Sequence, residues 1–307
     1  DLSAEDVTNF ILIDSVNVTE NGLLYLDDGD FNDVPLLDDR EYCYYVVTNG
    51  SYGNDLIEAP LINNSQQICV RPNDAIPPND PEIIIPTPAD TVFINGEPSF
   101  LLESLNCDVY ANEPCGFTNY SNTVEWGVDN IDGDIAGFNI YFSPSGESDS
   151  FNLVGTSRGP SFTHTGLSSL KGCYKISAVD RSNNESGLSI ALCFDNCPSY
   201  ELPNAFTPNG DNVNDTFKAF DQPNSQCPRF AQSVEFHVFS RWGGEELFTY
   251  NSLETTEGDI FINWDGRDNN GKELSAGTYY YLAIVTFDVF AEDKKVQQIK
   301  NWVNIIR

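Results

Sequence analysis

The 307-residue chain contains no methionine, only 2 histidines and only 15 lysines and arginines. Against these stand 47 aspartates and glutamates, which give a formal net charge of −32 at pH 7. Nucleic-acid binding needs clustered basic side chains, so this composition excludes nucleic acid as a natural partner. It also argues against binding to an anionic membrane surface. We expect most of the acidic side chains to keep an exposed protein soluble.

Long hydrophobic runs are missing as well. No apolar stretch reaches the roughly 18–20 residues of a membrane-spanning helix, so we expect a chain that is not itself membrane-spanning. The N-terminus shows no signal peptide, and methionine is absent even from the first position. We therefore expect a mature or truncated fragment of a longer exported protein.

Motifs of catalysis are scarce. The sequence contains no phosphate-binding loop, dinucleotide fingerprint or zinc-binding helix motif. Residues 155–159 match the G-x-S-x-G pattern, but that motif needs a strand, a sharp turn and a helix, and Pro160 follows in hairpin-like sequence. His164 and His237 lie in alternating strand sequence with no nucleophile indicated nearby. The sequence therefore predicts that the protein is not an enzyme.

Short strands separated by turn signals are what the chain has in abundance. Residues 41–47, 136–142, 173–180 and 279–289 are rich in apolar and aromatic residues, and no stretch has the period of a long helix. Six prolines between positions 72 and 90 predict an extended, semi-rigid linker. We therefore expect an all-β protein of tandem sandwiches, with domains at 1–72, 91–197 and 198–307 and a linker at 73–90.

An internal repeat relates the first two domains. In residues 1–72, Cys43 and Tyr44 open a strand and Cys69 closes the next one; Cys173, Tyr174 and Cys193 repeat the pattern in residues 91–197. Both domains resemble fibronectin type III modules. The second carries a core tryptophan, whereas the first lacks the opening strands and the tryptophan. We expect the first module to be partial.

Eight cysteines in an acidic, β-rich chain predict disulfides and an oxidising compartment. The repeat favours one bond within each module, and proximity along the chain favours two more local bonds. The expected pairs are Cys43–Cys69, Cys107–Cys115, Cys173–Cys193 and Cys197–Cys227. Sequence alone does not fix the connectivity. The alternative is a metal site at Cys193 and Cys197, although the ligand spacing is poor.

An oxygen-rich loop opens the last domain. Residues 203–217 have neither a helical nor a strand period, and Asn209 and Gly210 form a strong turn signal. The side chains that could ligate a cation are Asn209, Asp211, Asn214 and Asp215. Because Ca²⁺ takes six to eight oxygen ligands from a turning backbone, this loop is the candidate calcium site. The alternative is that these side chains cap their own turn.

This loop and four later motifs carry a family resemblance. The motifs are FSRWG at 239–243, WDGRDNNGK at 264–272, GTYYY at 277–281 and WVNIIR at 302–307. In this order they resemble the gliding-motility-type (type B) C-terminal domain on cargo of the Bacteroidetes type IX secretion system. One departure is Asn212, where the family usually has glycine. The resemblance implies an immunoglobulin-like sandwich and an extracellular, cell-surface location. It also implies two partners, an outer-membrane barrel of the PorP/SprF kind and the type IX translocon.

We expect the partner to bind the last hairpin, residues 294–307. A final strand offers unpaired backbone groups for strand addition, and this one concentrates positive charge in an acidic protein. The expected contact residues are Lys294, Lys295, Lys300, Trp302, Ile305 and Arg307. The predicted function is thus that of a C-terminal fragment of an adhesin-like surface protein, with its export and attachment signal in the last domain. The alternative is that the modules themselves form a glycan- or protein-binding adhesin stalk.

Two short patterns predict O-glycosylation. Asp14-Ser15-Val16 and Asp90-Thr91-Val92 resemble the Bacteroidetes O-glycosylation motif of an aspartate, a serine or threonine, and an apolar residue. The expected modified residues are Ser15 and Thr91.

Overall fold

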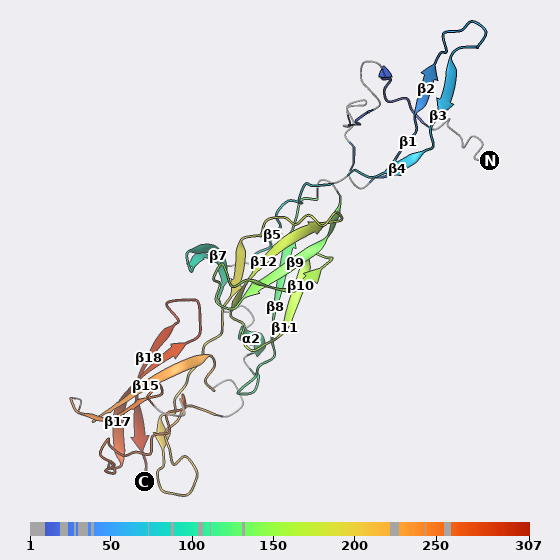
Figure 1. Ribbon diagram of the computed structural model, residues 1–307. Helices are drawn as coiled ribbons and strands as arrows, with labels where there is room; N and C mark the ends of the chain where they lie inside the picture. The colour runs from blue at the N-terminus through green and yellow to red at the C-terminus, as the bar shows by residue number, and fades with distance from the viewer. Residues whose placement is uncertain are drawn as a thin grey trace. The chain divides into compact units, whose positions relative to one another are not determined.

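The computed structural model describes most of the chain: residues 10–18, 24–27, 29, 36–37, 40–72, 74–86, 89–103, 107–110, 112–130, 133–221, 227–242, 244–254 and 259–307. Figure 1 shows that strands dominate. The chain divides into two compact units, one of residues 1–76 with 181–184, the other of residues 77–180 with 185–307. The expected all-β class is confirmed.

The first unit consists of two short antiparallel ladders. Strand β1 (Tyr42–Tyr44) pairs with β4 (Ile68–Val70), and β2 (Val47–Gly50) pairs with β3 (Leu61–Asn64). The first ladder places Cys43 opposite Cys69, and the two form a disulfide. The side chains of β2, β3 and β4 are exposed along their whole length. Within the described residues of this unit, backbone ladders and the disulfide therefore contribute more than a buried core does.

The second unit begins with a complete two-sheet module. Its first sheet has the order β11-β8-β5 and its second the order β10-β9-β12-β13-β7-β6. The bounds are β5 Glu82–Ile83, β6 Asp90–Ile94, β7 Glu97–Leu102, β8 Tyr120–Gly127, β9 Ile135–Ser143, β10 Asn152–Ser157, β11 Ser161–Leu167, β12 Gly172–Asp180 and β13 Ala191–Phe194. Without the hairpin β6–β7, three strands face four, as in a fibronectin III-like sandwich.

The core of this module lies between the two sheets. Trp126 of β8 is 1% exposed, and Ile140 of β9 and Ile176 of β12 are fully buried. Every second residue of β8 is buried and the residues between them are half-buried or exposed, because successive side chains of a strand point to opposite faces. The inserted hairpin β6–β7 joins the second sheet through a parallel pairing of β7 with β13.

The structure differs from the expected linker at 73–90. Within it, β5 pairs with β8 through Ile83 and Trp126, and Ile83, Ile85 and Ala89 pack against the module core. Pro81 and Pro86 flank β5, which is an edge strand, and an edge strand tolerates proline because one side of it has no ladder bonds to lose. The density of prolines therefore predicted a linker where the structure has an edge strand. The two units divide between residues 76 and 77, near the start of the expected linker.

The C-terminal domain is built on one five-stranded sheet of order β14-β18-β17-β15-β16. The bounds are β14 Ala205–Phe206, β15 Ala231–Phe239, β16 Glu246–Asn251, β17 Gly277–Phe287 and β18 Val296–Ile305. Strand β14 runs parallel to β18, and the other pairings are antiparallel. The long strands β15, β17 and β18 lie close to the C-terminus in Figure 1.

A thin second layer covers one face of this sheet. Phe217 and Trp264 exchange backbone N–H···O=C hydrogen bonds of 2.7 and 2.9 Å, and both side chains are buried. The ring of Phe217 stacks on Phe236 of β15, with centroids 5.4 Å apart, and packs against Tyr281 of β17. Trp264 thus anchors the core between this layer and the single five-stranded sheet. The opposite face of the sheet is left uncovered by this layer.

The four disulfides use all eight cysteines. The bonds Cys43–Cys69 and Cys173–Cys193 join facing strands, as expected. The expected pairs Cys107–Cys115 and Cys197–Cys227 are wrong, and the alternative metal site at Cys193 and Cys197 is wrong because both residues are in disulfides. The bonds present are Cys107–Cys197 and Cys115–Cys227. Proximity along the chain misled the prediction, because both partners are distant in sequence. Cys107 bonds Cys197 after the last strand of the module, and Cys115 bonds Cys227 in the C-terminal domain.

Candidate functional site

An aromatic row crosses the uncovered face of the C-terminal sheet. The strand register places Trp302 of β18 beside Tyr280 of β17, and Tyr280 beside Phe239 of β15. Trp302 is 41% exposed and Tyr280 is 50% exposed. These side chains, with Leu282 and Lys300, line a shallow groove of about 470 Å³. The row follows from alternation, since Val238 and Tyr281 point into the core and their chain neighbours must point out.

Lys300 is the charged residue of this groove. It is the only charged side chain in the groove lining, and within the described residues it forms no hydrogen bond or ion pair. Two other basic side chains near the groove already have partners. His237, on the same face, contacts Glu246 at 2.6 Å, and the Arg241 guanidinium lies 4.7 Å from the centre of the Trp242 ring. Among the described residues, the groove therefore offers an acidic group the unpaired ammonium of Lys300 beside aromatic surface.

The outer edge of β18 is open over most of its length. Its inner edge pairs with β17 from Val296 to Ile305, whereas β14 covers the outer edge only at Asn304 and Ile305. The N–H of Asn304 donates to the carbonyl of Asn204 on that outer side. Because the backbone N–H and C=O groups alternate in direction along a strand, those of residues 298, 300 and 302 point to the outer side of β18, as those of Asn304 do.

The side chain of Asn301 accepts the Trp302 N–H at 2.9 Å. Within the described part of the chain, no other strand pairs with residues 297–303 on this edge. The edge next to the groove can therefore add one further strand.

The expected contact residues do not all face a partner. Ile305 is 2% exposed and belongs to the core, so the prediction that it contacts a partner is wrong. Its position is set by alternation, which places Val303 and Ile305 on the covered face. Lys294 is engaged by Glu103 at 2.5 Å. These two positions show that the terminal hairpin is used partly for packing.

The remaining expected residues are accessible to different degrees. Lys295 lies 3.3 Å from Glu292, an exposed pair of small energetic weight. Arg307 binds the Glu273 carboxylate and also donates to the Pro208 carbonyl. Lys300 and Trp302 are the two that line the groove. Sequence reasoning missed Tyr280 and Phe239, although the alternation in residues 277–287 could have placed Tyr280 on the outer face.

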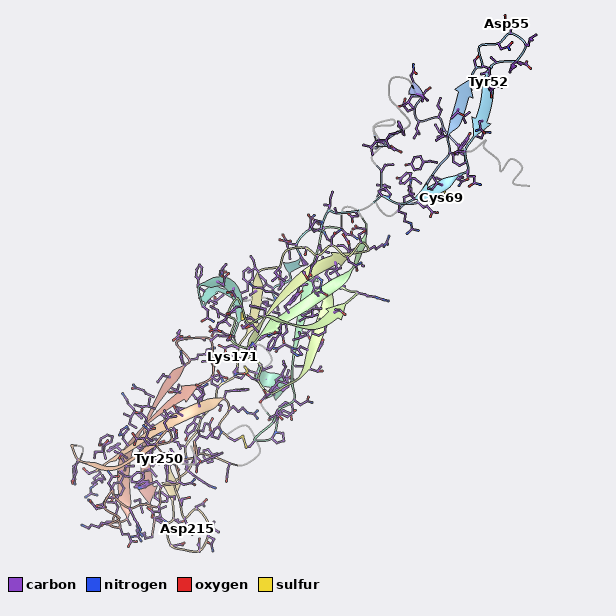
Figure 2. The ribbon with its side chains drawn as sticks, in the orientation of Figure 1. Tyr52, Asp55, Cys69, Lys171, Asp215 and Tyr250 are labelled. Carbon is purple, nitrogen blue, oxygen red and sulfur yellow. A yellow bond between two sulfur atoms is a disulfide. The ribbon has the colours of Figure 1, made fainter. Side chains whose placement is uncertain are left out.

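The oxygen-rich loop is held by Asp215, which Figure 2 labels. One carboxylate oxygen of Asp215 accepts the backbone N–H groups of Asn209 and Gly210 at 2.9 and 2.7 Å, and the other accepts that of Asn212 at 2.7 Å. These donors favour the ionised form and hold the pKa of Asp215 below its usual value. Asn212 has a φ of 65°, the left-handed region in which glycine is favoured and asparagine is tolerated.

The other candidate calcium ligands serve the same turn. Asp211 accepts the N–H of Val213 at 2.8 Å, and Asn209 accepts the N–H of Asp211 at 3.1 Å. The backbone carbonyl of Asn214 accepts the N–H of Thr207 at 2.8 Å. These contacts are those of the turn-capping alternative. A calcium ion would have to compete with backbone donors for the oxygens of this loop.

The predicted glycosylation sites are both on the surface. Ser15 is exposed, and its backbone N–H is bonded to the neighbouring Asp14 carboxylate. Thr91 is exposed on β6. A modifying enzyme must reach the side chain, and both hydroxyl-bearing residues are accessible to it.

Comparison with protein families decides the nature of the last domain. Residues 200–305 match the family model described as the CHU_C Type IX secretion signal domain. The C-terminal domain is a type IX secretion signal domain. A cargo signal of this kind is recognised by the secretion machinery and directs its chain to the cell surface. In the described part of the protein, no helix has the length and apolarity needed to cross a membrane.

Comparison with solved structures does not add functional information. Chicken CNTN1 FN1–FN3 domains match at 11% identity and a TM-score of 0.24, covering 80% of this chain and 73% of that one. The fibronectin(III)-like modules of Clostridium thermocellum CbhA match at 14% and 0.20, covering 61% and 84%. An alpha-L-rhamnosidase from Dictyoglumus thermophilum matches at 12% and 0.25, covering 62% and 27%. TM-scores this low do not support any conclusion about the function of this chain. Among curated proteins, none matches this chain.

Proposed function

We propose that this protein is the C-terminal part of an adhesin-like surface protein and that its signal domain belongs to the type B class. Its partner would be an outer-membrane barrel of the PorP/SprF kind, acting with the type IX translocon. The observation that carries the proposal is the open edge of β18 beside the aromatic groove and Lys300. We expect no catalytic activity from any of its domains.

The combination of edge and groove favours a protein strand as the bound element. A strand added along residues 297–303 would satisfy the outward backbone groups of β18, and an apolar side chain on it would reach Trp302 and Tyr280. Burying this edge in lipid would leave the same backbone groups without partners, which is costly. A glycan would use the aromatic surface without the edge. Lys300 adds a preference for an acidic residue in the partner strand.

Point variants test this contact more sharply than deletion of the last residues. A deletion of residues 300–307 would also remove Val303 and Ile305 from the core, so loss of display would not distinguish misfolding from lost recognition. We expect Trp302→Ala and Lys300→Glu each to lower surface display of the full chain at least about tenfold, the effect of losing about 1.4 kcal/mol of binding energy. Display is measured by protease accessibility on intact cells.

A matched control is available on the same domain. Trp242 is 83% exposed and lies outside the groove lining, so Trp242→Ala should leave display unchanged. Gln298→Pro removes one outward N–H of β18 and should lower display, because proline cannot donate to an added strand. Normal display of both Trp302→Ala and Gln298→Pro would exclude this edge as the recognition element.

The adhesin role has its own test. The modules precede the signal domain in the chain, so they can be tested for binding separately from it. If adhesion to glycan or protein surfaces follows residues 1–197, the modules are binders. If cells that display the intact chain adhere no better than cells without it, the binding role of these modules is refuted.

A further inference from the structure

A disulfide joins the fibronectin III-like module to the signal domain. Cys115 lies in the module, after the short helix α2 (Cys107–Tyr110), and its partner Cys227 lies in the signal domain just before β15. Cys107, the first residue of α2, bonds Cys197, which follows the last strand of the module. The first bond holds the two domains together, and the second fixes the start of the segment that connects them.

That connecting segment is hydrogen-bonded to the turn of the last hairpin. Asp195 is 2% exposed, and its two carboxylate oxygens accept the N–H groups of Phe290 and Ala291, each at 2.9 Å. Its neighbour Asn196 donates to the carbonyl of Asp288 at 2.7 Å. Residues 288–295 connect β17 to β18, so a buried carboxylate of the connecting segment binds the backbone of this turn.

Side chains of the module complete the contact. Lys171, labelled in Figure 2, lies 2.5 Å from the Asp288 carboxylate and 4.9 Å from the centre of the Phe290 ring. Lys294 on the other side of the turn pairs with Glu103. Ala291 is buried in one apolar cluster with residues of the module: Ile94, Leu101, Cys173, Ala191 and Cys193. The turn is therefore fixed by charge pairs, backbone hydrogen bonds and apolar packing at once.

We propose that the module at residues 77–197 is a working part of the secretion signal, because it fixes the turn of the hairpin whose outer strand is β18. The family match begins at residue 200, whereas Cys115, Lys171 and Asp195 lie before it. The unit presented to the secretion machinery is thus residues 77–307, with Asp195 as the positioning residue. The inference rests on the signal role of the last domain, and it does not require the groove to be the contact.

The test uses the full chain in the producing cell and after purification. Asp195→Asn keeps the shape of the side chain but replaces one acceptor oxygen with a donor. We expect hydrogen exchange at the Phe290 and Ala291 amides to become at least about tenfold faster, and surface display to fall several-fold. The matched control is Glu185→Gln, which alters another module carboxylate that accepts hydrogen bonds from Asn139 and Tyr141 and has no contact with the turn.

A second variant guards against a folding defect in the first. The double variant Cys115→Ser, Cys227→Ser opens the covalent bond between the domains, and its control is Cys43→Ser, Cys69→Ser in the first unit. Reduced display with a folded signal domain supports the inference. The inference is overturned if Asp195→Asn and the double variant Cys115→Ser, Cys227→Ser both display at the wild-type level. It is also overturned if the Phe290 and Ala291 amides stay protected in both.

The same measurements separate this inference from the proposed recognition site. Trp302→Ala should lower display while the Phe290 and Ala291 amides stay protected. If Trp302→Ala displays normally and Asp195→Asn does not, the groove is excluded as the contact and the role of the module stands.

Discussion

Replacement of Cys115 and Cys227 by serine should destabilise the second unit strongly. A disulfide stabilises a protein chiefly by restricting the unfolded chain, and the restriction grows with the loop that it closes. Cys115 and Cys227 are 112 residues apart in sequence, and Cys107 and Cys197 are 90 apart. The ladder bonds close loops of 26 and 20 residues. Cys115–Cys227 and Cys107–Cys197, here called the junction bonds, therefore impose the largest restrictions on the unfolded chain.

The two junction bonds are not independent. With Cys107–Cys197 intact, the shortest route from Cys115 to Cys227 passes through that bond and spans about 40 residues, so opening Cys115–Cys227 alone costs about 4 kcal/mol in the chain-entropy relation. Opening both removes the full restriction and costs about 9 kcal/mol. Removal of both bonds should thus cost slightly more than twice the single loss.

Thermal unfolding of the purified full chain measures this effect. Trp126 reports on the module core and Trp264 on the signal-domain core, since each is 1% exposed. A loss of about 4 kcal/mol lowers the melting temperature of a unit of this size by about 8–16 °C. With both junction bonds opened, the module and the signal domain should unfold in separate transitions. The control Cys43→Ser, Cys69→Ser should leave the fluorescence transition of the second unit in place.

An unchanged melting temperature in the Cys115→Ser, Cys227→Ser variant would refute this reasoning, provided mass spectrometry confirms that the remaining disulfides have formed. A drop in the control variant as large as that in the junction variant would refute it too, because the loop lengths would then play no part.

Three further predictions concern pH and calcium. Burial raises the pKa of Tyr281 to about 12 and that of Tyr174 also well above 10, so their contribution to stability is complete below pH 10 and is lost as the pH rises through the folded values. For Tyr281 alone this loss is about 2–3 kcal/mol by pH 12; phenolate absorbance showing all 14 tyrosines of the folded protein titrating near pH 10 would contradict it. The lowered pKa of Asp215 gives a contribution that is present above its ordinary value of 3.8 and is lost as the pH falls through the folded value, so the Gly210 amide should exchange faster in acid. Constant protection of that amide down to pH 2 would disprove the cap. Because the turn already uses the oxygens of its loop, calcium should leave the melting temperature within about 1 °C of its original value, a free-energy change below about 0.5 kcal/mol; a larger rise that Asp211→Ala abolishes would establish the calcium site.

Strand positions were the most predictable part of the fold. Alternation of apolar and polar residues is set by the pleat of each strand, so it located the strands around Trp126, Tyr174 and Tyr281 before any pairing was known. The same rule could have placed Ile305 in the core and Tyr280 outside. Proline density in residues 73–90 gave the wrong structure for β5, because an edge strand and an extended linker share this composition.

Composition, repeat pattern and motif order by themselves determined that this is an acidic, disulfide-bonded, all-β chain ending in a type IX secretion signal domain, since each of these depends on residue types or on local periodicity. Only the tertiary structure decided that Cys115 bonds Cys227, that Asp195 binds the turn of the last hairpin, and that β18 has one open edge beside Lys300. These features join residues about 100 positions apart or depend on the neighbour that a strand lacks, and local sequence carries no record of either.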